Sequence, residues 1–298
     1  MQHFIKTGQS TALMTPPIIT RKEAQQILLA SETGKSKISI SLDLGISKSE
    51  IEIKTGPKNK FAIINNQKLP LAEFEKLKED TCYFIEKNSL KPVIIFSDET
   101  NFYYKLLPTT DWPTITFSST PMHRHTLISP KEDSKRKVDA VSPIKGKVLD
   151  TCCGLGYTAI IASEKADDVI VFEHDENVIE IARLNPYSES LFDNKNTKIR
   201  LFQEDIALGI SKQKDRYFDR IIHDPPTFKY ASELYSKRFY QELFRVMKKG
   251  GILYHYCPNP GKMHGAEFHL RTLRDLKAVG FSDVKYDERS SGIIAKKN

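Results

Sequence analysis

Residues 147–160 read KVLDTCCGLGYTAI, and this stretch decides the fold. A short apolar run ends in an acid, Asp150, and a tight turn follows with glycines at Gly154 and Gly156. Residues 157–162 then have the character of a helix start. A strand, a glycine turn and a helix together bring bare backbone N–H groups against a nucleotide-like ligand. Glycine is needed because a Cβ atom would block both the turn and the approach.

The glycine turn alone leaves two ligand classes open. Residues 154–159 also fit the loose G-x-G-x-x-G/A pattern of dinucleotide-binding proteins, so an NAD-binding oxidoreductase is one alternative. Asp150 argues against it, because a carboxylate at that strand end suits an ammonium group and would repel a pyrophosphate. A later strand ends in Asp224-Pro225-Pro226, for which a dehydrogenase has no evident use.

The composition predicts a cytoplasmic protein with a substantial core. The chain has 298 residues, of which 39% are hydrophobic, and it contains no apolar run long enough to cross a membrane. The first residues lack the apolar segment of a signal peptide. Four cysteines without a C-x-x-C pair indicate a reducing compartment, and neither a disulfide framework nor a metal site. No membrane partner is therefore expected.

The net charge is compatible with an anionic partner. It is +7, and the sequence pI is about 9.0, which suits RNA. Lysine-rich chains are often simply well solvated, and no dense arginine tract is present. The charge alone therefore favours nucleic acid only slightly.

The C-terminal half alternates strands and helices in the way that predicts a parallel α/β sheet. The expected strands span 147–151, 168–173, 198–202, 219–223, 252–256, 283–287 and 292–295, and the last two form a closing hairpin. The expected helices span 134–140, 157–163, 176–184, 233–248 and 267–279.

The N-terminal half has the alternating pattern of antiparallel strands. The expected strands span 37–42, 50–54, 61–64, 92–96, 102–107 and 114–117, with helices at 21–31 and 71–81. We therefore predict an α+β substrate-recognition domain over 1–117, a linker with a lead-in helix over 118–145, and a catalytic domain over 146–298.

Two more acids follow strands of the C-terminal half. Glu173 ends the second strand, where its two oxygens can bind both hydroxyls of a ribose. Asp205 follows the third strand and can accept from an adenine amino group. With Asp150 at the amino-acid end, the three acids match the parts of S-adenosylmethionine.

On these residues, the sequence from Lys147 onward resembles the class I S-adenosylmethionine-dependent methyltransferases. The resemblance implies a Rossmann-like seven-stranded sheet with the last strand antiparallel, and S-adenosyl-L-methionine as the cofactor. The cofactor-binding residues we predict are Asp150, Cys152, Gly154, Leu155, Gly156, Glu173, His174 and Asp205.

The Asp224-Pro225-Pro226 segment predicts the acceptor site. Two prolines fix φ and remove two N–H donors, so that carbonyl oxygens are left unopposed beside a carboxylate. Such acceptors bind an exocyclic NH2 group and direct its lone pair at the methyl group. The segment resembles the motif of amino-methylating enzymes, which usually have an aromatic residue next to stack on a flipped base. Thr227 stands there instead, and Phe228 follows, as in some bacterial ribosomal RNA methyltransferases.

The whole chain also resembles an archaeal family of predicted methyltransferases. The matching segments are 41–45, 121–124, 150–159, 185–187, 223–228, 233–236 and 255–256. This resemblance implies that the N-terminal half belongs to the enzyme.

Other residues are candidates for the substrate site. His123 and Arg124 precede the catalytic domain and could hold a phosphate or carboxylate. His123 and His125 alone form no metal site, because further ligands are missing. Cys257 follows the fifth strand, where RNA 5-methylcytosine enzymes place a nucleophile. Tyr230 and Tyr235 could stack on a base, but their helical spacing also fits core packing.

Together these features predict a methyltransferase that modifies a nitrogen of a base in structured RNA, such as tRNA or rRNA. The catalytic residues are Asp224, Pro225, Pro226 and Phe228. The alternatives are a small-molecule methyl- or aminopropyltransferase, a 5-methylcytosine methyltransferase using Cys257, and the NAD-binding oxidoreductase. No metal is expected.

Overall fold

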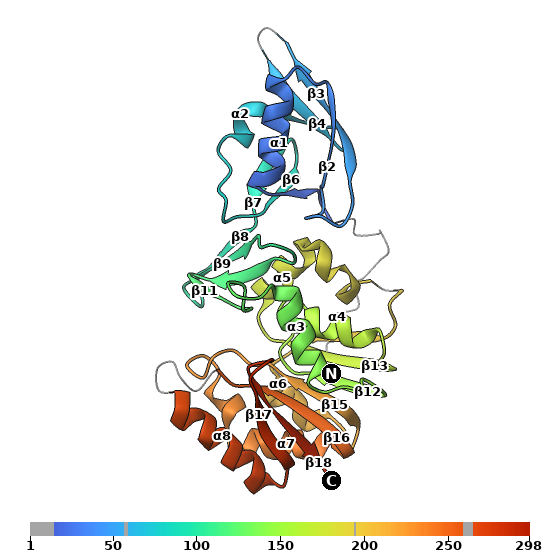
Figure 1. The fold of residues 1–298 in the computed structure, drawn as a ribbon, viewed down its shortest axis with the longest axis vertical. Helices are drawn as coiled ribbons and strands as arrows, with labels where there is room; N and C mark the ends of the chain where they lie inside the picture. Colours follow the sequence, from blue (N-terminus) through green and yellow to red (C-terminus); the bar gives the residue numbers. More distant parts are fainter. Residues whose placement is uncertain (1–14, 57–58, 194, 259–264) are drawn as a thin grey trace. The chain divides into compact units, whose positions relative to one another are not determined.

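The computed structural model describes residues 15–56, 59–193, 195–258 and 265–298, and these fall into two compact units (Figure 1). The larger unit contains 131–179 and 190–298. The smaller unit contains the described residues up to 130 together with 180–189.

A seven-stranded sheet forms the centre of the larger unit, and its strand order is β14-β13-β12-β15-β16-β18-β17. Strands β12 to β16 are parallel where they pair, whereas β18 runs antiparallel to both β16 and β17. The sequence prediction of a seven-stranded sheet with an antiparallel last strand is confirmed. The strands are β12 (Lys147–Asp150), β13 (Asp168–Glu173), β14 (Ile199–Gln203), β15 (Phe218–His223), β16 (Met247–Tyr256), β17 (Ser282–Asp287) and β18 (Gly292–Lys297).

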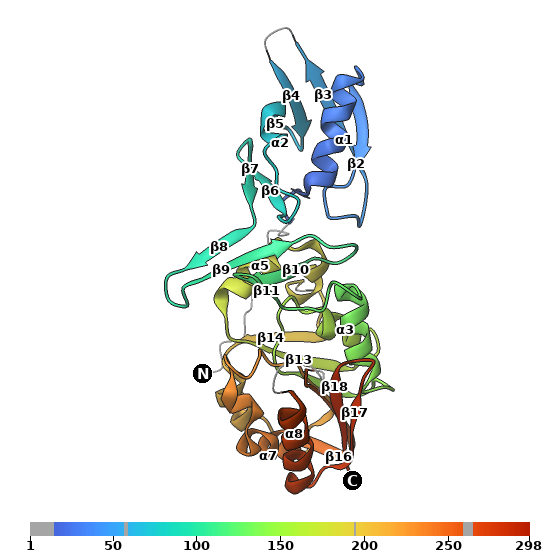
Figure 2. The same cartoon turned by 60° about the vertical axis from the view of Figure 1, so that its left-hand side comes forward.

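Helices cover both faces of this sheet, because its strands bury apolar side chains on both sides. Leu149 and Ile221 belong to one core cluster, while their neighbours Val148 and Ile222 belong to another. Residues of α7 and α8, which lie side by side in Figure 2, contribute to the first cluster, and residues of α3 and α4 to the second. The helices are α3 (Pro130–Asp139), α4 (Tyr157–Ser163), α6 (Ile206–Gly209), α7 (Lys237–Val246) and α8 (Gly265–Val279), with short 3-10 turns η2 (Ile210–Lys212) and η3 (Ser232–Tyr235). Helix α5 (Glu176–Leu184) and the 3-10 turn η1 (Pro186–Leu191) each have residues in both units.

The strand order reverses between β12 and β15. The chain passes from β12 to β13 and β14 on one side, and then returns to β15 on the other side. In open parallel sheets, ligands bind at the carboxyl ends of the strands next to such a reversal. From this topology we expect the ligand to bind beside Asp150 and Asp224.

The smaller unit is built from antiparallel sheets and one long helix. Helix α1 begins with a capping box, in which Thr20 and Glu23 bond to each other's backbone N–H groups, and it buries Ala24 and Ile27. These residues pack in one core cluster with apolar side chains of β2 to β5. The elements are β1 (Ile18–Ile19), α1 (Arg21–Glu32), β2 (Lys37–Ile40), β3 (Ser49–Thr55), β4 (Lys60–Ile64), β5 (Gln67–Pro70), α2 (Leu71–Phe74), β6 (Tyr83–Glu86), β7 (Ser89–Pro92), β8 (Ile94–Ser97), β9 (Phe102–Leu107), β10 (Thr114–Phe117) and β11 (Thr120–Pro121).

Two predicted helices are longer than the observed ones. The helix expected over 71–81 ends at Phe74, and beyond it the Glu75 and Leu77 carbonyl groups accept hydrogen bonds from Arg21. The helix expected over 233–248 is a 3-10 turn followed by α7, which ends at Val246. Strand β16 begins at Met247, and its pairing with β15 shifts register immediately afterwards.

Candidate active site

Four acids lie at or just beyond the carboxyl ends of neighbouring parallel strands. Asp150 ends β12 and Glu173 ends β13, while Asp205 and Asp224 follow β14 and β15. Because these strands are adjacent and parallel, the sheet gathers all four acids at one edge.

Asp150 is completely buried at this edge. Its Oδ2 atom accepts a hydrogen bond of 2.5 Å from the Thr158 hydroxyl group, whereas its Oδ1 atom meets no hydrogen-bond donor among the residues that the structure describes. Burial raises the pKa of Asp150 to about 7, helped by the negative charges of Asp224 and Glu173 and opposed by the Thr158 bond. A buried oxygen without a donor suits a ligand that brings N–H groups or positive charge.

Glu173 lies against the glycine turn. Its Oε2 atom accepts from the Gly154 N–H at 2.8 Å, and its Oε1 atom accepts from the Asp175 N–H at 3.0 Å. Burial raises the pKa of Glu173 to about 7 despite these two bonds. A ribose would therefore meet a carboxylate that is already oriented by the backbone.

The second glycine of the turn is sterically required. Gly156 has a φ of +78° and caps the N-terminus of α4, and a Cβ atom there would lie 2.2 Å from the Leu191 side chain. From the sequence, glycine is expected here because a Cβ atom would block the approach of the ligand. The structure shows that packing against Leu191 demands it as well.

The remaining predicted cofactor residues have different surroundings. Asp205 accepts from the Ala207 N–H at 2.8 Å and is the N-cap of α6. His174 is exposed and Cys152 half-buried, while Leu155 is fully buried and can offer a ligand only its backbone. These residues surround the same edge, and their individual roles stay predictions.

Asp224 forms an ion pair that the sequence did not indicate. Its Oδ2 atom lies 2.6 Å from the Nζ atom of Lys137, a buried lysine on α3. Lys137 also lies 3.0 Å from Asp133 on the same helix. The only signal in the sequence is the i,i+4 spacing of Asp133 and Lys137. Such acid–lysine pairs are common on exposed helices, so this spacing does not predict a buried cluster.

The prolines after Asp224 are held by a tyrosine. The Tyr235 hydroxyl group donates to the Pro226 carbonyl oxygen at 2.9 Å, and it lies 3.5 Å from the Pro225 carbonyl oxygen. The expectation that both carbonyl groups are unopposed is therefore wrong, because the Tyr235 hydroxyl group makes a short hydrogen bond to Pro226 and a long one to Pro225. Tyr235 is buried, so it packs in the core and does not stack on a base.

The residues beyond the prolines face solvent. Phe228 is 43% exposed and Tyr230 is 50% exposed, and the Lys229 ammonium group lies over the Tyr230 ring. Phe228 also contacts the edge of the Tyr235 ring, with centroids 5.8 Å apart. This exposed aromatic and basic segment directly follows the acceptor motif.

A buried histidine ties the ends of β12 and β15 together. His223 accepts from the Thr151 hydroxyl group at its Nδ1 atom, 2.7 Å away, and donates from its Nε2 atom to the Leu234 carbonyl oxygen at 3.1 Å. Burial lowers the pKa of His223 to about 3, so the ring is neutral and its two hydrogen bonds give it a structural role.

Cys257 lies in the hydrophobic core and is fully buried. Burial raises the pKa of its thiol to about 12. A nucleophilic cysteine needs exposure and a low pKa, so this geometry counts against the 5-methylcytosine alternative.

The predicted substrate residues His123 and Arg124 belong to the smaller unit. The His123 ring is buried and lies 2.9 Å from the Thr114 hydroxyl group through its Nδ1 atom. This bond fixes the chain after β10, which gives His123 a structural use within its own unit.

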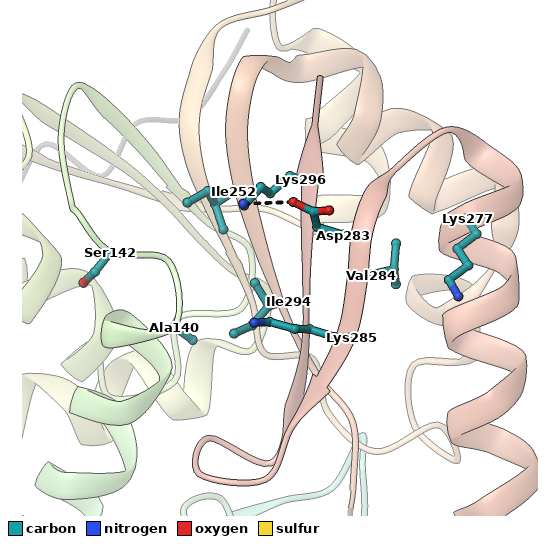
Figure 3. Close-up of a pocket in the computed structure, with 9 residues that line it drawn as sticks. All are labelled: Ala140, Ser142, Ile252, Lys277, Asp283, Val284, Lys285, Ile294 and Lys296. Atoms are coloured by element: carbon teal, nitrogen blue, oxygen red, sulfur yellow. Dashed lines mark hydrogen bonds and ion pairs between the residues drawn. The ribbon is translucent and has the colours of Figure 1, made fainter.

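A separate cavity of about 620 Å³ lies along the β17–β18 hairpin (Figure 3). Lys277, Lys285 and Lys296 line it, and Lys296 bonds to Asp283 across it. None of the predicted cofactor residues lines this cavity.

Within the described ranges, no helix is long and apolar enough to span a membrane. Among the same residues, no cluster of acids, histidines or cysteines is arranged for a metal ion.

Comparison with known proteins identifies the larger unit. The family model of the methyltransferase small domain matches residues 136–266. This match sets aside the NAD-binding oxidoreductase alternative.

The chain is 39% identical to MJ1233 of Methanocaldococcus jannaschii over 291 residues, which cover 96% of this chain and 98% of that protein. It is also 25% identical over 203 residues to the cytoplasmic isoleucine–tRNA ligase of Saccharomyces cerevisiae, across 62% of this chain and 17% of the ligase.

Among solved structures, the spermidine synthase of Thermotoga maritima superposes with a TM-score of 0.53 at 21% identity, over 69% of this chain and 72% of the synthase. At that identity the likeness shows a shared fold.

Proposed function

This chain belongs to the family of MJ1233 and is an S-adenosylmethionine-dependent methyltransferase, and we propose that it methylates a nitrogen of a base in structured RNA. The observation that carries the proposal is the position of Asp224. It follows β15 beside the strand-order reversal, two prolines come directly after it, and the exposed Phe228 follows one residue after them.

The cofactor residues fit S-adenosylmethionine, which supplies an activated methyl group on a positively charged sulfur. The unpartnered Oδ1 atom of buried Asp150 suits the ammonium group of its methionine end. The Glu173 carboxylate suits the ribose hydroxyl groups, and Asp205 lies at the next strand end for the adenine. The glycine turn supplies N–H groups between them.

Asp224 and the Pro225 carbonyl group would orient the acceptor. They accept hydrogen bonds from an N–H group and leave the nitrogen lone pair directed at the methyl group. The nearby carboxylate would stabilise the positive charge that the nitrogen gains when it takes the methyl group, and it would accept the proton that the nitrogen then releases. Alignment of this kind is most of what a protein must add when the methyl donor is already activated.

Three observations support RNA as the acceptor. The net charge is +7. The exposed Phe228, Lys229 and Tyr230 combine stacking surfaces with a cation beside the acceptor motif, as single-stranded nucleic-acid sites do. A stretch of 203 residues of this chain is 25% identical to part of a tRNA ligase.

A small amine is the second candidate acceptor. The edge that holds Asp224 also holds Asp150 and Glu173, and three carboxylates would attract a cationic metabolite and repel a phosphate. An aminopropyl transfer is less suited to the site, because the decarboxylated cofactor lacks the carboxylate that balances charge at the methionine end.

The two candidates are separated by incubating the protein with tritiated cofactor and fractionated pools of RNA, protein and metabolites. We expect label in structured RNA from the wild type and none with Asp224→Ala. Asp167→Ala is the matched control, since Asp167 is an exposed acid just before β13, at the opposite end of that strand. Label in the metabolite pool alone would select the small-amine candidate, and undiminished labelling by Asp224→Ala would refute the acceptor site.

A further inference from the structure

Lys137 is almost completely buried and contacts two acids at once. Its side chain is 3% exposed, and its Nζ atom lies 2.6 Å from Asp224 Oδ2 and 3.0 Å from Asp133 Oδ2. Asp133 and Lys137 are four residues apart on α3 and therefore share a helix face. The ring of Tyr256, the last residue of β16, lies 5.5 Å from the same ammonium group. The Asp133 side chain is fully buried, whereas that of Asp224 is 22% exposed.

This cluster adds little free energy to the packing of α3. A buried ion pair gains little over well-packed apolar side chains, because both charges lose their hydration. Burial would lower the pKa of Lys137, but Asp224 and Asp133 outweigh it and hold the pKa above its usual value. Lys137 therefore keeps its positive charge between the two acids.

We infer that Lys137 is a positioning residue for the acceptor site, and that it fixes the Asp224 carboxylate in one orientation and keeps it ionised. This inference rests on the proposed role of Asp224 as the group that orients the acceptor nitrogen. Of the two acids, Asp224 is the one that is partly exposed, so its carboxylate is the one that an acceptor nitrogen could meet.

Several described groups that interact with Asp224 disfavour its ionisation. Asp150 and Cys152 at the end of β12 and Tyr235 of η3 each interact with it electrostatically, and Asp133 shares the Lys137 ammonium group with it. None of these four groups brings a positive charge. We therefore expect loss of the Lys137 charge to favour protonation of Asp224, which would then donate a hydrogen bond instead of accepting one.

The direct test is the titration of Asp224 itself, which needs no acceptor. Carbon-13 NMR of labelled aspartate carboxyl groups gives its midpoint, with the signal assigned by its loss in Asp224→Asn. We expect Lys137→Met to raise that midpoint by at least about one pH unit and Lys137→Arg to leave it near the wild-type value. An unchanged midpoint in folded Lys137→Met would overturn the inference.

Activity gives the second readout. With tritiated cofactor and whichever pool the wild type labels, Lys137→Met should lower kcat about 100-fold at pH 7 and move the acid limb of the pH profile upward, while the cofactor KM stays within about twofold. Lys137→Arg should recover part of the rate. A purely structural lysine predicts loss of stability with the wild-type pH profile.

A third variant covers the case in which Lys137→Met does not fold. Asp133→Asn leaves the ammonium group to Asp224 alone, so the Asp224 midpoint should fall, and an unchanged midpoint would count against the inference. If the wild type labels no pool, the proposed function fails while the NMR titration still decides whether Lys137 controls Asp224.

Discussion

The phenol of Tyr235 holds the Pro226 carbonyl group of the acceptor motif through a hydrogen bond of 2.9 Å. Tyr235 comes from the η3 turn, nine residues after Pro226, and its ring is packed between Phe228, His255 and Phe268. The segment that precedes α7 therefore fixes the loop that follows β15, and the loop geometry depends on a core residue.

Tyr235→Phe should loosen this loop without disturbing the cofactor. The ring keeps its packing, but the Pro226 carbonyl group loses its donor, so we expect about 1 kcal/mol less stability in urea denaturation. The rate of methyl transfer should fall about tenfold, because the acceptor is less well aligned. Calorimetry should show the wild-type affinity for S-adenosylhomocysteine. A wild-type rate in the folded variant would show that the bond has no part in positioning the acceptor.

Gly156→Ala should be strongly destabilising for two separable reasons. A φ of +78° is unfavourable for alanine, and the new Cβ atom would lie 2.2 Å from the Leu191 side chain. We expect a loss of about 3 kcal/mol or more in thermal or denaturant unfolding. Cofactor binding should weaken as well, since the glycine turn must shift.

Gly250→Ala is the matched control for that substitution. Gly250 has a φ of +73°, and a Cβ atom there would meet nothing within 4 Å. Gly250→Ala should lower the free energy of unfolding only by the strain of a positive φ at alanine, about 1 kcal/mol. Equal losses in the two variants would mean that Leu191 moves aside and that packing does not require the glycine.

Much of the fold followed from the sequence because the parallel strands are doubly buried. The strand over 168–173 and the helices over 157–163 and 176–184 were predicted with the observed bounds, since apolar runs and glycine or acidic punctuation mark their ends. The end of α7 was less visible. Met247 is apolar and fits the helical spacing, yet it pairs with Phe218 as the first residue of β16.

The site was predictable at the level of strand ends but not at the level of partners. Asp150, Glu173 and Asp224 could be placed because parallel strands deliver their carboxyl ends to one edge. Lys137 could not, because its contact with Asp224 joins residues 87 positions apart through the packing of α3. The same holds for the Tyr235 bond, since a tyrosine at helical spacing gives no sign of where its hydroxyl group points.

Cys257→Ala should retain methyl transfer. The thiol is buried in the core with a pKa of about 12, so it offers no thiolate to attack a ring. We expect about 1 kcal/mol lower stability from the lost packing and a rate within about twofold of wild type. The native protein should also leave Cys257 unmodified by iodoacetamide, as mass spectrometry would show. Abolished transfer in the folded variant would restore the 5-methylcytosine mechanism.

The affinity for cofactor should depend on pH through Asp150. Its pKa is raised to about 7 by burial and by neighbouring acids, so Asp150 titrates near neutral pH in the ligand-free protein. A ligand ammonium group beside Oδ1 favours the ionised carboxylate, and binding must then release a proton. Below pH 7 the affinity for S-adenosylhomocysteine should fall by up to about tenfold per pH unit, and above pH 8 it should level off. Calorimetry in buffers of different ionisation enthalpy measures the protons released.

The stability of the ligand-free protein should show the opposite trend, because the folded-state pKa of Asp150 is higher than its unfolded value of 3.8. The folded state binds the proton more tightly, so this stabilising contribution is fully present below about pH 4 and is lost as the pH rises through 7. Glu173, whose pKa is also raised to about 7, adds a contribution of the same sign. Asp150→Asn should therefore flatten part of both pH dependences, and Asp167→Asn, at an exposed site, is the matched control variant. An Asp150→Asn variant that binds with the wild-type affinity and pH profile would remove Asp150 from the cofactor site.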